Sequence, residues 1–241
     1  MSQIKLNLNK SCFLIIVLLV IGIFFRFVNL EKKIYWPDET FTSLRISGHT
    51  VQEAVEKLYD GRVISIADLH KYQTLNSDRN VSDTINGLAI EEPQQTPLYY
   101  ILVRFWVQLF GESVALTRSF SAGISLLVFP AIYWLCRELF DCTLTAWVAI
   151  ALIAISPFHV LYAQEARPYA FWTVTILISS AALLRAMRLK TQFSWSLYIV
   201  TLAISLYTFL LSGLVALSHG IYVLTREKFR LTKTVIAYLL A

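Results

Sequence analysis

Charged residues are scarce in this chain. Asp, Glu, Lys and Arg make up only 15% of the 241 residues, whereas 56% are hydrophobic. A soluble domain carries about 25% charged residues, so the composition argues against an ordinary soluble fold and favours an integral membrane protein. The basic residues lie in short clusters between apolar runs rather than in one patch. We therefore interpret them as topology signals and expect no nucleic-acid partner.

Cysteine is rare, and a signal-peptide cleavage site is lacking. Cys12, Cys136 and Cys142 form no CxxC pair, which argues against a disulfide framework or a cysteine metal site. The uncharged run from Ser11 to Phe25 is followed by Arg26 and more large residues, not by a small-x-small motif. We expect an uncleaved anchor with a cytoplasmic N-terminus, and an Arg26 side chain that snorkels to the interface.

Apolar runs of membrane length fill much of the chain, and a helix needs about 20 such residues to span the hydrocarbon core. The predicted fold is therefore all-α and integral to the membrane: a multi-spanning helical bundle, forming a single membrane domain over residues 1–241. About five spans are expected within 119–230, and 231–241 is interpreted as the start of an incomplete further helix. The predicted spans are 11–30, 119–136, 144–163, 169–187 and 194–212, with a shorter one at 213–225.

The apolar segment from Pro97 to Phe110 decides the topology. It is short, begins at a proline and contains Arg104, so an interfacial helix is favoured over a span. The basic clusters after the later apolar runs then face the cytoplasm, as the positive-inside tendency requires, whereas a spanning segment would place them outside. Consequently, residues 31–118 form a large external loop on the same face as the Gln164–Tyr169 turn.

The external loop carries its own helix signals. Thr50-Val-Gln-Glu53 is a capping box, and the apolar spacing after it predicts a short amphipathic helix on the membrane surface. The Asn-, Ser- and Asp-rich stretch over 76–87 is expected to be looser.

Asp38 and Glu39 follow the first apolar run, beside Tyr35 and Trp36. A like charge and partial burial would raise the pKa of Asp38 and suit it to act as a general base. The alternative is an acidic pair at a helix N-terminus after Pro37, where the helix dipole is favourable.

Glu165 and Arg167 lie at the mouth of an apolar run, where ionisable groups usually mark a site. Pro168 disfavours helical geometry at Arg167, which frees its side chain to bind a phosphate at headgroup level. The alternative is a Glu–Arg pair that neutralises itself. His49 and His159 are expected to make plain polar contacts.

One base and one phosphate-binding cation suffice to transfer a sugar from a lipid phosphate, because the leaving phosphate needs no general acid.

Three motifs stand out along the chain. In order, they are Trp36-Pro-Asp-Glu-Thr40, Gln95-Thr-Pro-Leu-Tyr-Tyr100 followed by Leu109-Phe-Gly111, and Tyr162-Ala-Gln-Glu-Ala-Arg-Pro-Tyr169. Together they resemble the GT-C membrane glycosyltransferases. Their closest likeness is to the bacterial branch akin to protein O-mannosyltransferases and the aminoarabinose transferases of lipid A, of glycosyltransferase family 39 type. The resemblance runs from about residue 20 to 230.

The resemblance implies a multi-pass protein of the plasma (inner) membrane with surface helices in its first external loop. It implies a polyprenyl-phosphate sugar donor and an unidentified acceptor on the extracytoplasmic side. Asp38 would be the catalytic base, with Glu39 as its neighbour, and a divalent metal could be held by Asp38 and Glu165. The residues expected to line the donor phosphate or substrate are Gln164, Glu165, Arg167, Tyr169 and Tyr99.

Two departures from the family are visible. Many relatives carry His-Pro-Pro where this chain has Gln95-Thr96-Pro97. Relatives are also commonly about twice as long, so the chain looks C-terminally short. Two alternative functions also stay open. One is a transporter or flippase-like module, and the other is an inactive truncated fragment or lipid-binding partner subunit.

Overall fold

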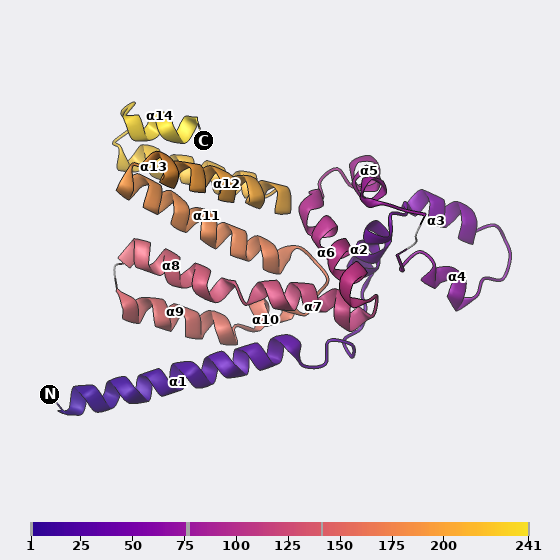
Figure 1. Ribbon diagram of the computed structural model, residues 1–241, viewed down its shortest axis with the longest axis horizontal. Coiled ribbons are helices and arrows are strands. Elements are labelled where there is room, and N and C mark those ends of the chain that lie inside the picture. Colours follow the sequence, from indigo (N-terminus) through magenta and orange to yellow (C-terminus); the bar gives the residue numbers. More distant parts are fainter. Residues whose placement is uncertain (1, 76–77, 141, 241) are drawn as a thin grey trace.

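Every element that the structure describes is a helix (Figure 1). The computed structural model describes residues 2–75, 78–140 and 142–240. The all-α prediction is confirmed for these ranges. The helices are α1 Ser2–Phe27, α2 Pro37–Ser47, α3 Val51–Leu58, α4 Ile66–His70, α5 Val81–Glu91, α6 Pro97–Phe110, α7 Val114–Ser125, α8 Val128–Phe140, α9 Thr143–Ile155, α10 Pro157–Ala163, α11 Tyr169–Leu189, α12 Gln192–Thr208, α13 Ser212–Arg226 and α14 Lys233–Leu239.

The helices form an elongated bundle with a smaller group of helices at one end (Figure 1). In the bundle, α1, α9, the continuous pair α7 and α8, α11, α12 and α13 lie roughly side by side. The smaller group, α2 to α6, lies where α1 ends and α7 begins; we call this the loop end. The opposite end carries the α8–α9, α11–α12 and α13–α14 connections. We call it the basic end, because Arg137, Arg188 and Arg226 lie in the last turns of α8, α11 and α13, Lys190 follows α11, and Lys233 begins α14.

Two of the described helices are long and apolar enough to cross a membrane. They are Val114–Phe140, which joins α7 and α8, and Tyr169–Leu189. The pair Thr143–Ile155 and Pro157–Ala163 would be a third span, although it bends by 61°. Phe13–Phe27 and Pro97–Phe110 are shorter apolar helices. Length and composition thus give two to three candidate spans among the described residues, which indicates membrane character with fewer clear spans than the apolar runs predict.

The bend between α9 and α10 also corrects the interpretation of Arg26. Pro157 has no N–H to donate to Ile153 four residues earlier, so the last carbonyls of α9 need other donors. The buried Arg26 supplies them: its guanidinium donates to the carbonyls of Ala154 at 2.8 Å and Ile153 at 3.1 Å. The predicted snorkelling was wrong, because a helix C-terminus attracts a cation and here binds it inside the protein.

Gly22 allows α1 to approach α9 closely. A Cβ atom at Gly22 would lie 2.3 Å from the carbonyl oxygen of Ala154, whereas one at Gly123 in α7 would meet nothing within 4 Å. Gly22→Ala is therefore expected to lower the free energy of unfolding by about 1–3 kcal/mol through overpacking. Gly123→Ala, its matched control, should be neutral or stabilising by up to about 1 kcal/mol through helix propensity. Thermal unfolding of the purified proteins in detergent checks this, and equal midpoints for the two variants would contradict it.

The loop end confirms some predictions and corrects another. The capping box of Thr50 and Glu53 is present and begins α3, and α6 covers the predicted segment Pro97–Phe110. The stretch predicted to be loose instead contains the start of α5. Asn80 caps the N–H groups of Ser82 and Asp83, while the Asp83 carboxylate accepts from the Asn80 N–H. This reciprocal cap overrides the polar composition of the segment; residues 76–77 lie outside the described residues.

The predicted external loop and the 164–168 turn do share one end of the bundle. Gln164 donates to the carbonyls of Phe25 and Val28, and the Ala166 N–H donates to Glu39 at 2.8 Å. The geometric condition for one composite polar site is therefore met.

Candidate functional site

A buried ion pair between Glu39 and Arg118 organises the loop end. Both side chains are fully buried, and two Arg118 nitrogens donate to the two Glu39 oxygens at 2.8 and 2.7 Å. Glu39 comes from the first turn of α2, and Arg118 comes from α7. The Ala166 N–H also donates to Glu39, and because the side chain is fully buried this carboxylate exposes no oxygen to a substrate. The arrangement favours a positioning role for Glu39; its predicted catalytic role stays a prediction.

Arg118 also fixes the chain that leads from α1 to α2. Its guanidinium donates to the carbonyl of Leu30, and to those of Lys33 and Ile34 at 3.0 Å each. The same guanidinium lies 5.3 Å from the ring centroid of Tyr35. The segment that delivers Asp38 is thus held by one cation in a well-defined position.

Asp38 and Arg167 meet at the surface of this assembly. Asp38 lies in the first turn of α2, where Pro37 takes the first helical position, and its side chain is 40% exposed. The Arg167 side chain, only 7% exposed, lies 3.7 Å from the Asp38 carboxylate and donates to the Asp38 carbonyl at 3.3 Å. Asp38 therefore lies at a helix N-terminus, as the alternative interpretation expected. Its carboxylate is still accessible, so the geometry also allows it to act as a general base.

Glu165 and Arg167 do not neutralise each other. Lys33 donates to Glu165, whose side chain is buried, while Arg167 faces Asp38. The self-neutralising pair is therefore absent, and the 164–168 turn presents its two charges to two different segments. Gln164 satisfies carbonyls at the C-terminal end of α1, so its observed contacts are structural rather than directed toward a ligand.

Three tyrosines surround Arg167 in different ways. Tyr99 is fully buried and its hydroxyl pairs with Ser121 at 2.8 Å, so it holds α6 to α7 and has no surface for a substrate. Tyr169 begins α11, with its ring centroid 5.6 Å from the Arg167 guanidinium. Tyr100, which follows Tyr99 on α6, is buried but its hydroxyl has no partner among the described residues.

The electrostatics keep Arg167 a cation and Tyr100 a neutral donor. Burial opposes the charge of Arg167, but the hydrogen bond with Tyr169 and the nearby Asp38 carboxylate favour it, and the pKa of Arg167 stays above its usual value. Burial raises the pKa of Tyr100 to about 12, against the opposing effect of Arg167. Arg167 Nε and the Tyr100 hydroxyl are thus buried donors with no acceptor in the described chain. Such donors suit an anionic oxygen ligand.

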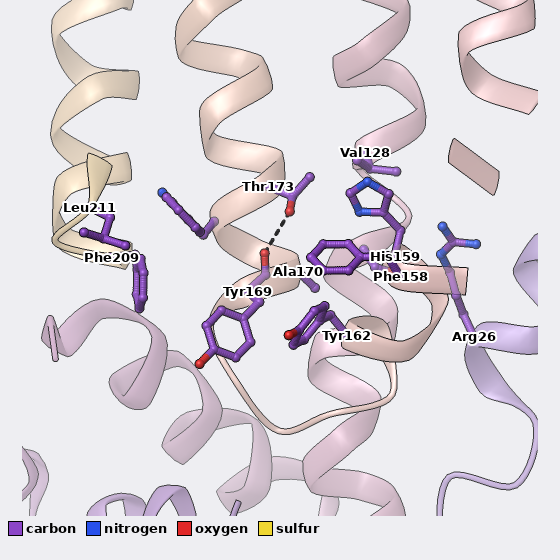
Figure 2. Close-up of a pocket in the computed structure, with 12 residues that line it drawn as sticks. Arg26, Val128, Phe158, His159, Tyr162, Tyr169, Ala170, Thr173, Phe209 and Leu211 are labelled. Atoms are coloured by element: carbon purple, nitrogen blue, oxygen red, sulfur yellow. Dashed lines mark hydrogen bonds between the residues drawn. The ribbon is translucent and has the colours of Figure 1, made fainter. Parts of the chain in front are cut away.

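An apolar pocket of about 410 Å³ opens beside this polar group (Figure 2). Tyr162 and Tyr169 line it with ring centroids 4.8 Å apart, and Phe209 lies 5.8 Å from Tyr169. Arg26 and His159 reach it from α1 and α10 (Figure 2). Tyr169 both lies near the Arg167 guanidinium and lines the pocket, so a polar and an apolar surface meet at this residue.

The two candidate metal ligands, Asp38 and Glu165, are engaged with different cations. Across residues 2–75, 78–140 and 142–240, no group of three or more His, Cys, Asp or Glu side chains could hold a metal ion.

Sequence reasoning missed Lys33, Tyr100 and Arg118. Arg118 and Lys33, the second of two adjacent lysines, lie at the edges of apolar runs. Each meets its acidic partner only after folding. Because a charge at the end of a membrane span needs a partner or water, the positions of Lys33 and Arg118 in the sequence could have marked them as candidates. His49 contacts Glu53 at 3.3 Å, the plain polar contact expected for it.

Comparisons with known proteins add no family assignment: no family model, no curated protein and no solved structure matches this chain.

Proposed function

We propose that this chain is a membrane glycosyltransferase that moves a sugar from a polyprenyl-phosphate donor to an acceptor hydroxyl on the extracytoplasmic side. The observation that carries the proposal is the pairing of an accessible carboxylate, Asp38, with a buried cation, Arg167, at one end of an apolar bundle. An aromatic pocket adjoins them through Tyr169. A lipid phosphate would fit both surfaces, because its anionic phosphate suits Arg167 and its apolar chain suits the pocket.

The chemistry follows from these groups. Asp38 accepts the proton of the acceptor hydroxyl, whose oxygen attacks the anomeric carbon of the donor sugar. The bond from that carbon to the phosphate oxygen breaks, and the leaving polyprenyl phosphate takes the electron pair. Arg167 balances its charge, with the Tyr100 hydroxyl as a second donor. Binding the phosphate would draw Arg167 from Asp38, whose 3.7 Å contact is long for an ion pair, and so free the base.

The proposal includes a membrane arrangement. The five or six apolar runs would cross the inner membrane, with the shorter helices α12 and α13 completing the bundle beside α11. The loop end would face the extracytoplasmic side, and the basic end and the N-terminus would face the cytoplasm. The basic residues in the short connections of the basic end, such as Arg137, Arg188 and Arg226, support this orientation, because the positive-inside tendency is counted over short loops.

Thiol labelling tests the orientation. After replacing the three native cysteines with Ser, single cysteines are placed at Val63 and Leu231, which are highly exposed at the loop end and after α13. A membrane-impermeant maleimide is expected to label Val63→Cys in intact spheroplasts and Leu231→Cys only after permeabilisation. Labelling of both in intact spheroplasts would contradict the arrangement.

A transfer assay tests the activity. Purified protein in lipid vesicles is given a radiolabelled polyprenyl-phosphate sugar and hydroxyl acceptors, and a labelled product is expected.

The broken helix α9–α10 is the observation that favours the transporter alternative, because discontinuous helices are typical of transporters. Movement of the labelled donor across the vesicle membrane without product formation would support that alternative and overturn the transferase.

A further inference from the structure

A groove between α12 and α14 lies at the basic end, far from Asp38. It has a volume of about 780 Å³, larger than the pocket beside Tyr169. On α12 it is lined by Gln192, Trp195, Ser196 and Ile199, whose spacing places them on one helix face. The facing wall comes from α14, which starts at the same end and runs beside α13 and α12 (Figure 1).

The groove changes from cationic to apolar along its length. Lys190, at the end of α11, and Lys233, at the start of α14, line its mouth. Ile199, Ala237 and Leu240 lie further along the two helices and are apolar. A groove with lysines at one end and apolar residues along the rest suits a lipid with an anionic headgroup, because the headgroup would meet the lysines and the acyl chain the apolar residues.

The two lysines are available to such a headgroup. Within the described ranges, neither Lys190 nor Lys233 forms an ion pair, whereas neighbouring Arg188 is committed to Glu138 at 2.8 Å. One carboxylate, Glu227, also lines the groove, so its mouth keeps a net positive charge. Trp195 adds an indole, which is typical of residues at the membrane–water interface.

We infer that this groove binds one anionic phospholipid, with the phosphate between Lys190 and Lys233 and an acyl chain along α12 and α14. Basic pockets between membrane helices favour anionic headgroups on the cytoplasmic leaflet. The site is separate from the proposed transferase centre and does not depend on it. Its role would be to hold α14 against the bundle at a fixed membrane depth.

Native mass spectrometry of the detergent-purified chain tests the inference. The protein is incubated with equal amounts of phosphatidylglycerol and phosphatidylcholine of matched acyl chains, and retention of phosphatidylglycerol is expected to dominate. Lys190→Gln combined with Lys233→Gln should reduce the ratio of the two adducts by about 10- to 30-fold, since each basic residue contributes a factor of about 5.

The matched control is Lys228→Gln combined with Arg230→Gln. It removes two exposed charges from the same end of the bundle, at residues that do not line the groove. The ratio should stay within about twofold of the original. Equal retention of both lipids, or an equal loss in both double variants, would overturn the inference in favour of diffuse surface charge.

Trp195 gives a second readout that does not depend on adduct survival. Brominated phosphatidylglycerol in vesicles should quench the fluorescence of the chain, and Trp195→Phe should remove part of the quenched signal. A dimer that is lost in the Lys190→Gln, Lys233→Gln variant, without any lipid preference, would assign the groove to a second copy and overturn the inference.

Discussion

Asp38→Asn is expected to lower the rate of sugar transfer by about 10²- to 10⁴-fold, the usual contribution of a general base. The amide keeps the shape of the side chain but cannot take a proton from the acceptor hydroxyl. The substitution should leave the thermal midpoint nearly unchanged, because Asp38 is partly exposed and its ion pair with Arg167 is long at 3.7 Å. Initial rates at saturating donor, measured with folded protein in vesicles, check the effect.

Asp60→Asn is the control for this variant. Asp60 is an exposed carboxylate of the same group of helices, paired with Arg62 at 2.9 Å and remote from Arg167 in the sequence. Transfer by Asp60→Asn should match the original chain. Full activity in Asp38→Asn would exclude Asp38 as the base, and unchanged donor binding in that variant would show that only the chemical step was lost.

The sequence predicted local elements well where the signal was local. Pro97 at one end and Gly111 at the other set the bounds of α6, and the Thr50–Glu53 capping box begins α3. The same rule would have found α5, because Asn80 and Asp83 form an equivalent reciprocal cap within a polar stretch. Composition alone was misleading there.

The partners in the candidate site could not be predicted in the same way. Glu39 and Arg118 are separated by 79 residues, and Arg26 reaches carbonyls 127 and 128 residues away. Such contacts depend on how α1, α7 and α9 pack, which no short motif encodes. The sequence correctly indicated that charges at membrane edges need partners, but the alternative it left open, a Glu165–Arg167 pair, does not form: Glu165 pairs with Lys33 and Arg167 faces Asp38.

Glu39→Gln is expected to destabilise the protein by about 3–5 kcal/mol, because it leaves the buried Arg118 without its counter-charge. The Gln amide group would also direct hydrogens at either the guanidinium or the Ala166 N–H. The thermal midpoint in detergent should therefore fall sharply. The surface pair supplies the control: Arg62→Gln, which breaks the exposed Asp60 contact, should cost at most about 1 kcal/mol.

A double variant, Glu39→Leu with Arg118→Met, separates the ion pair from the wider role of Arg118. Replacing a buried ion pair by apolar residues is often neutral or stabilising, so a simple pair would recover its stability. Arg118 also serves the carbonyls of Leu30, Lys33 and Ile34, which the double variant leaves without a donor. We therefore expect the double variant to stay less stable than the original chain and to place Asp38 loosely, with reduced transfer. A double variant as stable and active as the original would show that Arg118 does not position the segment before α2.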